Sequence, residues 1–209
     1  MLCAICNLRR ARRYCPGVKG EICAICCGTE REVTISCPFD CVYLREARRH
    51  EKPPLPAELP NSDIHITDEM IDENQELFGA ISYAIVKAAD DNPGTVDFDV
   101  REALAGLIRT YRTLQSGIYF ETRPGNLLAQ AVYEAVQTAV AAFRADEQRR
   151  TGFARTRDAV VLRLLVFLQK YEYALNNGRK KGRAVLDALH EPYRESDDAA
   201  PPPSSLILP

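Results

Sequence analysis

The sequence lacks the groups that several classes of enzyme need. Only three histidines occur among its 209 residues, and because they stand on separate segments they form no nucleophile–base pair. The stretch Gly178-Arg-Lys-Lys-Gly182 lacks the strand-to-helix context and the Ser or Thr of a phosphate loop. The stretch Asp187-Ala-Leu-His190 is the single approach to the Glu-x-x-His pairs of a di-iron bundle. These absences predict that the protein is not an enzyme.

Long apolar runs are also missing. The most apolar segment, AVVL at 159–162 and LLVFL at 164–168, is interrupted by Arg163 and is too short to span a bilayer. No basic and apolar leader precedes Cys3, so the sequence predicts neither secretion nor membrane insertion. We therefore expect a cytoplasmic protein, in which thiols stay reduced and can bind metal.

Cysteine is absent after position 41, and all eight cysteines lie between positions 3 and 41. The tetrapeptide CAIC occurs twice, and each copy places two sulfurs on one tight turn, as tetrahedral zinc requires. A segment of about 50 residues rarely folds without metals or disulfides. A disulfide framework is the alternative, but a reducing cytoplasm favours metal. The predicted ligands of two zinc ions are Cys3, Cys6, Cys15, Cys23, Cys26, Cys27, Cys37 and Cys41.

An approximate duplication suggests how these cysteines pair, since CAICNLRRARRYCP aligns with CAICCGTEREVTISCP. In the second copy a turn, a short extended pair over 32–36 and a helix carrying two more thiols follow the order of a treble-clef finger. This order predicts two sites, formed by Cys23, Cys26, Cys37 and Cys41 and by Cys3, Cys6, Cys15 and Cys27.

Three alternatives to this pairing stay open. Cys26 and Cys27 are adjacent and could exchange roles. In a cross-brace, the pair at 3 and 6 would share its metal with the pair at 23 and 26. His50 could also replace one cysteine, although its place after a basic helix favours a surface histidine.

The first copy resembles the opening of HIT-type zinc fingers, in which a C-x-x-C turn precedes an aromatic residue and a Cys-Pro. The matching residues are Cys3, Cys6, Tyr14, Cys15 and Pro16. The resemblance implies two zinc ions in a cross-brace and a role in protein contacts. It ends after this first copy, because Val18 stands where the next cysteine of those fingers is expected and no cysteine follows His50.

Charge divides unevenly between the two parts of the chain. Residues 1–52 contain ten Lys and Arg against six Asp and Glu, a net +4, whereas the rest carries −6. Two sites of four thiolates and one Zn²⁺ would each carry a formal −2, so bound metal would neutralise most of the positive charge. Candidate phosphate contacts are Arg9, Arg10, Arg12, Arg13, Arg45, Arg48 and Arg49, with GRKKGR at 178–183 as a second basic patch.

The rest of the chain predicts a mainly α fold. Four prolines within 52–66 favour a stiff linker that holds the cysteine-rich module (residues 1–51) at some distance from the body. Helical periodicity within 67–190 then predicts a four- to five-helix bundle. The predicted helices span 67–92, 98–116, 124–150, 154–175 and 183–190.

Residues 191–209 form an acidic, Pro-rich segment that we expect to be disordered. Its last apolar residues, Leu206, Ile207 and Leu208, are either an incidental end or a docking peptide on a flexible tether. The sequence therefore predicts a protein-interaction adaptor with an unidentified protein partner. A DNA- or RNA-binding protein that uses the arginine-rich module is the alternative.

Overall fold

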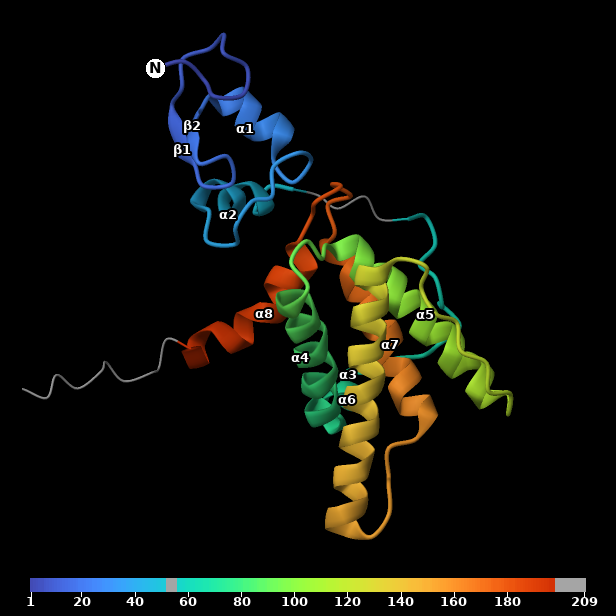
Figure 1. The fold of residues 1–209 in the computed structure, drawn as a ribbon. Coiled ribbons are helices and arrows are strands. Elements are labelled where there is room, and N and C mark those ends of the chain that lie inside the picture. The colour runs from blue at the N-terminus through green and yellow to red at the C-terminus, as the bar shows by residue number, and fades with distance from the viewer. Residues whose placement is uncertain (52–55, 198–209) are drawn as a thin grey trace, which may run out of the picture.

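A computed structural model describes residues 1–51 and 56–197 of the chain. In these ranges the chain forms two short strands and eight α-helices, so the predicted mainly helical class is confirmed. Figure 1 shows the cysteine-rich module, in blue and cyan, at one end of a larger helical domain. None of the helices in the described ranges is both long and apolar enough to cross a membrane.

The cysteine-rich module is built from one hairpin and two short helices. Its two strands pair antiparallel, with Cys15 opposite Gly20. The extended pair expected over 32–36 is absent, because backbone groups of that segment bond to Glu30 in a turn that makes a single bridge between Arg31 and Ile35. The elements of the module are β1 (Arg13–Cys15), β2 (Gly20–Ile22), α1 (Ala24–Glu30) and α2 (Val42–Arg48).

The helical domain packs its helices around one apolar core. Helix α4 lies against α6 and α8, and α5 lies against α6 and α7. Leucines and valines of α7 are buried on most sides, including Leu164 and Leu165 at 0% exposure, which places α7 at the centre. The helices are α3 (Asp68–Glu73), α4 (Gln75–Asp91), α5 (Asp97–Gln115), α6 (Leu127–Thr151), α7 (Asp158–Leu175) and α8 (Ala184–Asp197).

The helices predicted over 98–116, 124–150 and 154–175 shift by at most four residues at an end, and the first and last predicted helices differ more. Thr67 caps the first one as expected, accepting a hydrogen bond from the Met70 amide at 3.3 Å, but the helix is interrupted at Asn74. The Asn74 side chain donates to the Met70 carbonyl at 2.8 Å, an intrahelical bond that competes with the backbone ladder. Helix α8 continues past its predicted end and contains Pro192.

The segment between the module and α3 is fastened to the helical domain by Asn61. Its side-chain carbonyl accepts two hydrogen bonds from Arg112 of α5, at 2.8 and 3.0 Å, and its amide donates to Gln169 of α7 at 2.7 Å. Ile64 and Ile66 pack against the core. The second half of the predicted linker is therefore part of the domain, because its own side chains hold it there.

A buried carboxylate begins α8. Asp97 stands at the start of α5, is 1% exposed and accepts hydrogen bonds from the amides of Val185 and Leu186 at 3.1 and 3.2 Å. It thus caps a helix that is distant in sequence. Burial raises the pKa of Asp97 to about 7; amide hydrogen bonds oppose this rise, and the nearby Glu172 carboxylate adds to it.

This raised pKa predicts a pH-dependent stability. An unfolded Asp titrates near pH 3.9, so between about pH 4 and pH 7 the native state binds more protons and the free energy of unfolding falls as pH rises. We expect urea unfolding between about pH 5.5 and pH 8 to show this fall, and Asp97→Asn to lack it. Equal slopes in both proteins would contradict the prediction, even if the variant is less stable at every pH.

Candidate metal centre

Four cysteines come together at the tip of the cysteine-rich module. The sulfur atoms of Cys3, Cys6, Cys23 and Cys26 all lie within 4.8 Å of one another. Three of these residues are buried, and Cys6 is partly exposed. Four thiolates in one cluster are the donor set of a closed, structural tetrahedral site. These residues therefore fit a metal ion such as zinc.

Local backbone bonds explain why the two CAIC turns meet. Asn7 adopts a positive φ of 51°, a conformation that Asn tolerates, and its amide donates to the Cys3 carbonyl at 2.9 Å to close the first turn. The Ala4 amide then donates to the Glu21 carbonyl of β2, also at 2.9 Å. Because Cys23 follows β2 directly, this bond brings the second turn against the first.

The second CAIC turn begins helix α1. Cys23 is the N-cap residue, and its sulfur accepts a hydrogen bond from the Cys26 amide at 3.4 Å. This bond holds the two sulfurs on the same side of the first helical turn. The order of turn, hairpin and helix thus surrounds the group Cys3, Cys6, Cys23 and Cys26. The sequence predicted this order for the second copy of the repeat alone.

The four thiols influence one another strongly. Burial raises the pKa of Cys3, but hydrogen bonds from the backbone of Cys6, Cys23 and Ile5 outweigh it and lower the pKa to about 6. Burial and the neighbouring thiols raise the pKa of Cys26 to about 12. The Cys3 thiol thus favours its thiolate form, whereas the Cys26 thiol strongly disfavours it. A bound cation would remove this conflict, because it attracts all four sulfurs as thiolates.

The core of the module is itself made largely of cysteine. Apart from cysteines, the buried apolar side chains described within residues 1–51 are Ile22, Ile35 and Leu44. Three aliphatic side chains cannot offset the conformational entropy of ordering this module. The structure therefore supports the view that metal binding, and not hydrophobic burial, stabilises it.

The observed group corrects the pairing preferred from the sequence. Cys23 and Cys26 lie with Cys3 and Cys6, as the cross-brace alternative has it, and not with Cys37 and Cys41. The hairpin between the two copies decides this, since it folds Cys23 back onto Cys3. The remaining four predicted ligands, Cys15, Cys27, Cys37 and Cys41, line a small cavity deeper in the module.

His50 lies apart from both sets of cysteines. Its side chain is 76% exposed, and its Nε2 is 3.2 Å from Glu46 of α2, the helix that ends just before it. It is not part of the four-sulfur group. The structure therefore gives no support to a histidine ligand there.

Several arginines proposed as phosphate contacts are engaged within the protein. Arg48 forms ion pairs with Glu32, at 2.7 Å, and with Asp187, and its side chain is only 16% exposed. Arg13 stacks over Tyr43 at 4.1 Å. The other proposed arginines are exposed at the surface. Arg49 pairs there with Glu46, and Arg45 donates to the Asp40 carbonyl. Arg9, Arg10 and Arg12 lie close in sequence to the cysteines of the four-sulfur group.

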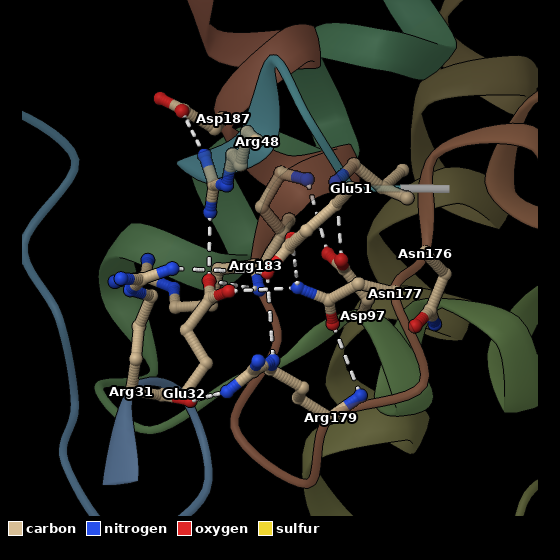
Figure 2. Close-up of polar contacts among 12 residues, drawn as sticks. Arg31, Glu32, Arg48, Glu51, Asp97, Asn176, Asn177, Arg179, Arg183 and Asp187 are labelled. Atoms are coloured by element: carbon tan, nitrogen blue, oxygen red, sulfur yellow. Dashed lines mark hydrogen bonds and ion pairs between the residues drawn. The ribbon is translucent and has the colours of Figure 1, made fainter. Parts of the chain in front are cut away.

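Module and helical domain are in direct contact, so the expectation that a linker holds them apart is wrong. Much of the contact is made by the loop between α7 and α8 (residues 176–183), which meets the turn after α1 (Figure 2), and Asp187 of α8 adds an ion pair with Arg48. Arg179 donates to the Arg31 carbonyl at 2.7 Å, and Lys181 donates from its Nζ to the Thr34 carbonyl at 2.7 Å. The GRKKGR segment thus binds the module and is not a free basic patch.

Glu32 is the centre of this contact. It is 1% exposed, and its carboxylate accepts hydrogen bonds from Arg48 at 2.7 Å, from Asn177 at 2.9 Å and from the Arg183 amide at 3.2 Å. Its carbonyl accepts the Lys181 amide at 2.7 Å. Figure 2 shows Arg48, Asn177 and Arg183 gathered around Glu32.

Sequence reasoning missed Glu32. One acid within a mixed polar stretch carries no periodic or motif signal. The one unusual feature is structural, a positive φ of 52° for a non-glycine residue.

The predicted docking residues Leu206, Ile207 and Leu208 lie outside the described residues. Comparisons with protein-family models, with curated proteins and with solved structures give no match. The resemblance of the first CAIC copy to HIT-type fingers therefore stays a resemblance over a few residues.

Proposed function

We propose that this protein is a non-enzymatic, zinc-dependent adaptor that binds a protein partner through its cysteine-rich module. In this proposal zinc occupies the Cys3, Cys6, Cys23 and Cys26 group, and the order of turn, hairpin and helix around it is that of a treble-clef-like finger. Four thiolates saturate a tetrahedral zinc ion, so such a site leaves no position for substrate. A cytoplasmic location agrees with thiols that must stay reduced.

The observation that carries the proposal is the apolar surface around the four-sulfur group. Leu2, Leu8 and Ile25 are 59%, 81% and 54% exposed. Each lies within two residues of a cysteine of the group, and those sulfurs lie within 4.8 Å of one another, so the backbones that carry the three side chains lie close to one site. Large apolar side chains gathered on a rigid surface are typical of protein contacts.

The arrangement of basic groups favours a protein partner over nucleic acid. Phosphate binding needs arginines and lysines that can release counterions when they meet the backbone. In the module, Arg48 is committed to Glu32 and Asp187, while Arg179 and Lys181 of the basic loop hold the module itself. The C-terminal residues Leu206, Ile207 and Leu208 remain a second proposed docking element, and its partner is unidentified.

Two charged substitutions test the adaptor proposal. We expect the double variant Leu8→Asp and Ile25→Asp to keep its metal content and thermal stability, since both side chains are exposed. The amount of protein partner that it captures should be at least about tenfold lower than the amount captured by the purified, metal-loaded wild-type chain, because burying a carboxylate in an apolar contact is costly. Quantitative mass spectrometry of captured proteins measures this. Leu127→Asp, at an 80% exposed position on α6, is the matched control and should retain the partner.

The nucleic-acid alternative is tested with the same preparations. If it holds, mixed-sequence DNA or RNA should bind, with an affinity that falls about 10³- to 10⁵-fold between about 50 mM and 200 mM salt if six to ten phosphates are contacted. We expect no such salt-dependent binding. Salt-sensitive binding that survives Leu8→Asp and Ile25→Asp but is lost on Arg10→Ala and Arg12→Ala would replace the adaptor proposal.

A further inference from the structure

We propose that Cys15, Cys27, Cys37 and Cys41 form a second metal site, of the same closed four-thiolate class, between the first site and the helical domain. This inference rests on the proposed zinc binding of the module and completes the predicted count of two ions. This set of four cysteines differs from both sets that the sequence repeat favours, which are Cys23, Cys26, Cys37 and Cys41 and Cys3, Cys6, Cys15 and Cys27.

All four cysteines line one small cavity. Its volume is about 10 Å³, and its other walls include Ile22, Ile35 and Leu44. Such a volume holds about one sphere the size of a water molecule. Cys15 and Cys27 are 9% and 8% exposed. A small cavity lined by four sulfur-bearing residues, three aliphatic side chains and the arginines Arg13 and Arg31 offers a metal ion suitable ligands.

Close backbone approach helps to place these cysteines around one cavity. The turn that follows Cys15 lies directly against Ile35 and Ser36, so a Cβ added to Gly17 would stand 2.6 Å from the Ile35 side chain and 2.7 Å from the Ser36 carbonyl. Only glycine permits this approach, which places the Cys15 end of the hairpin beside Cys37. Cys41, in turn, is the N-cap residue of α2.

Helix geometry assigns the adjacent cysteines of α1 to different sites. Successive residues of an α-helix point about 100° apart, so Cys26 and Cys27 cannot both face the first group. Cys26 lies in that group and Cys27 lines the second cavity. Helix α1 would therefore donate one ligand to each metal. Because Cys26 and Cys27 are adjacent, one short helix can serve both sites.

A cation also borders the second cavity. Arg13 lines it and donates from Nη1 to the Cys27 sulfur at 3.8 Å. The guanidinium is fixed by stacking over Tyr43 at 4.1 Å. A four-thiolate zinc site carries a formal −2, and an adjacent arginine offsets part of that charge.

This second site would set the surface by which the module contacts the helical domain. Phe39 lies between Cys37 and Cys41, and its ring receives Arg183 at 4.2 Å and contacts His190 with ring centroids 6.2 Å apart. Helix α2, which begins after Cys41, carries Arg48 to Glu32 and Asp187. A metal bound to Cys37 and Cys41 would therefore fix both ends of the segment that carries Phe39, and the start of the helix that carries Arg48.

Metal content of the full chain and of single variants tests this inference. We expect two zinc ions per wild-type chain by elemental analysis, and one per chain in Cys37→Ser, in Cys41→Ser and in Cys6→Ser. Ser36→Ala, an exposed change next to Cys37, is the control and should keep two. In case a serine variant fails to fold, cobalt titration of the unchanged chain should give two successive increments of thiolate-to-cobalt absorption.

The outcomes separate the two sites. One ion in the wild type that survives in Cys37→Ser but is lost in Cys6→Ser would overturn the second site and leave the first intact. One ion that survives in Cys6→Ser but is lost in Cys37→Ser would overturn the proposed first site and support the second. A single cobalt increment, or no metal in the wild-type chain, would overturn the inference.

Discussion

Removal of zinc by a chelator is expected to unfold residues 1–51 and to leave the helical domain folded. A structural zinc site contributes about 10–16 kcal/mol in isolated finger peptides, which matches or exceeds the whole stability of a typical domain, about 5–15 kcal/mol. The module has few other sources of stability, since Ile22, Ile35 and Leu44 are its buried aliphatic side chains among the described residues. The helical domain has a separate apolar core.

Two measurements distinguish local from global unfolding. Backbone amide NMR spectra should lose the dispersed signals of the module and recover them when zinc is returned. Helical circular dichroism should fall only slightly, because α1 and α2 contribute seven residues each whereas α5 and α6 alone have 19 and 25. Cys3→Ser should lose the metal of the four-sulfur group, as chelation does, because Cys3 is fully buried in that group.

His50→Ala is the matched control for metal removal. The histidine is 76% exposed and contacts Glu46, so we expect unchanged metal content and stability. A chelated protein that keeps its dispersed module signals would contradict the prediction. Loss of metal in His50→Ala would instead indicate that His50 is a metal ligand.

The sequence predicts which residues belong to the metal centre better than how they pair. A C-x-x-C spacing guarantees that two sulfurs share a turn, so the pairs at 3 and 6 and at 23 and 26 could be recognised directly. Which pairs then meet depends on hydrogen bonds between distant backbone groups, such as the Ala4 amide and the Glu21 carbonyl. No residue type encodes such a bond, so the repeat alone favoured the wrong partners.

Helices were predictable for a related reason. Apolar residues of α4 to α7 recur with helical periodicity, and many of them, such as Leu104 and Val132, are buried. Interruptions that depend on one side chain, such as Asn74 between α3 and α4, have no periodic signal. The basic GRKKGR segment shows a further limit, since its charge suggested nucleic acid while its contacts fasten the module to the helical domain.

Replacing Glu32 should have the second large effect, because several buried donors depend on it. We expect Glu32→Ala to lower the free energy of unfolding by about 3–5 kcal/mol, the cost of leaving a buried ion-pair partner uncompensated. Arg48, the Asn177 side-chain amide and the Arg183 backbone amide would all lose an acceptor. Urea unfolding of the zinc-loaded chain measures the change, and hydrogen exchange of the Lys181 amide, which donates to the Glu32 carbonyl, reports whether the module separates from the helical domain.

Glu46→Ala is the matched control, since Glu46 of α2 pairs with Arg49 and His50 just after the helix but is 60% exposed. An exposed pair contributes about 0–1 kcal/mol, so the control should change little. In a double-mutant cycle, Glu32→Ala and Arg48→Ala should be less than additive, because the two side chains share one contact whose loss is counted once. If Glu32→Ala is no more destabilising than Glu46→Ala, or if Lys181 exchange is unchanged, then Glu32 does not hold the module to the helical domain. The remaining contacts, among them those of Arg179 and Lys181, would then have to do so.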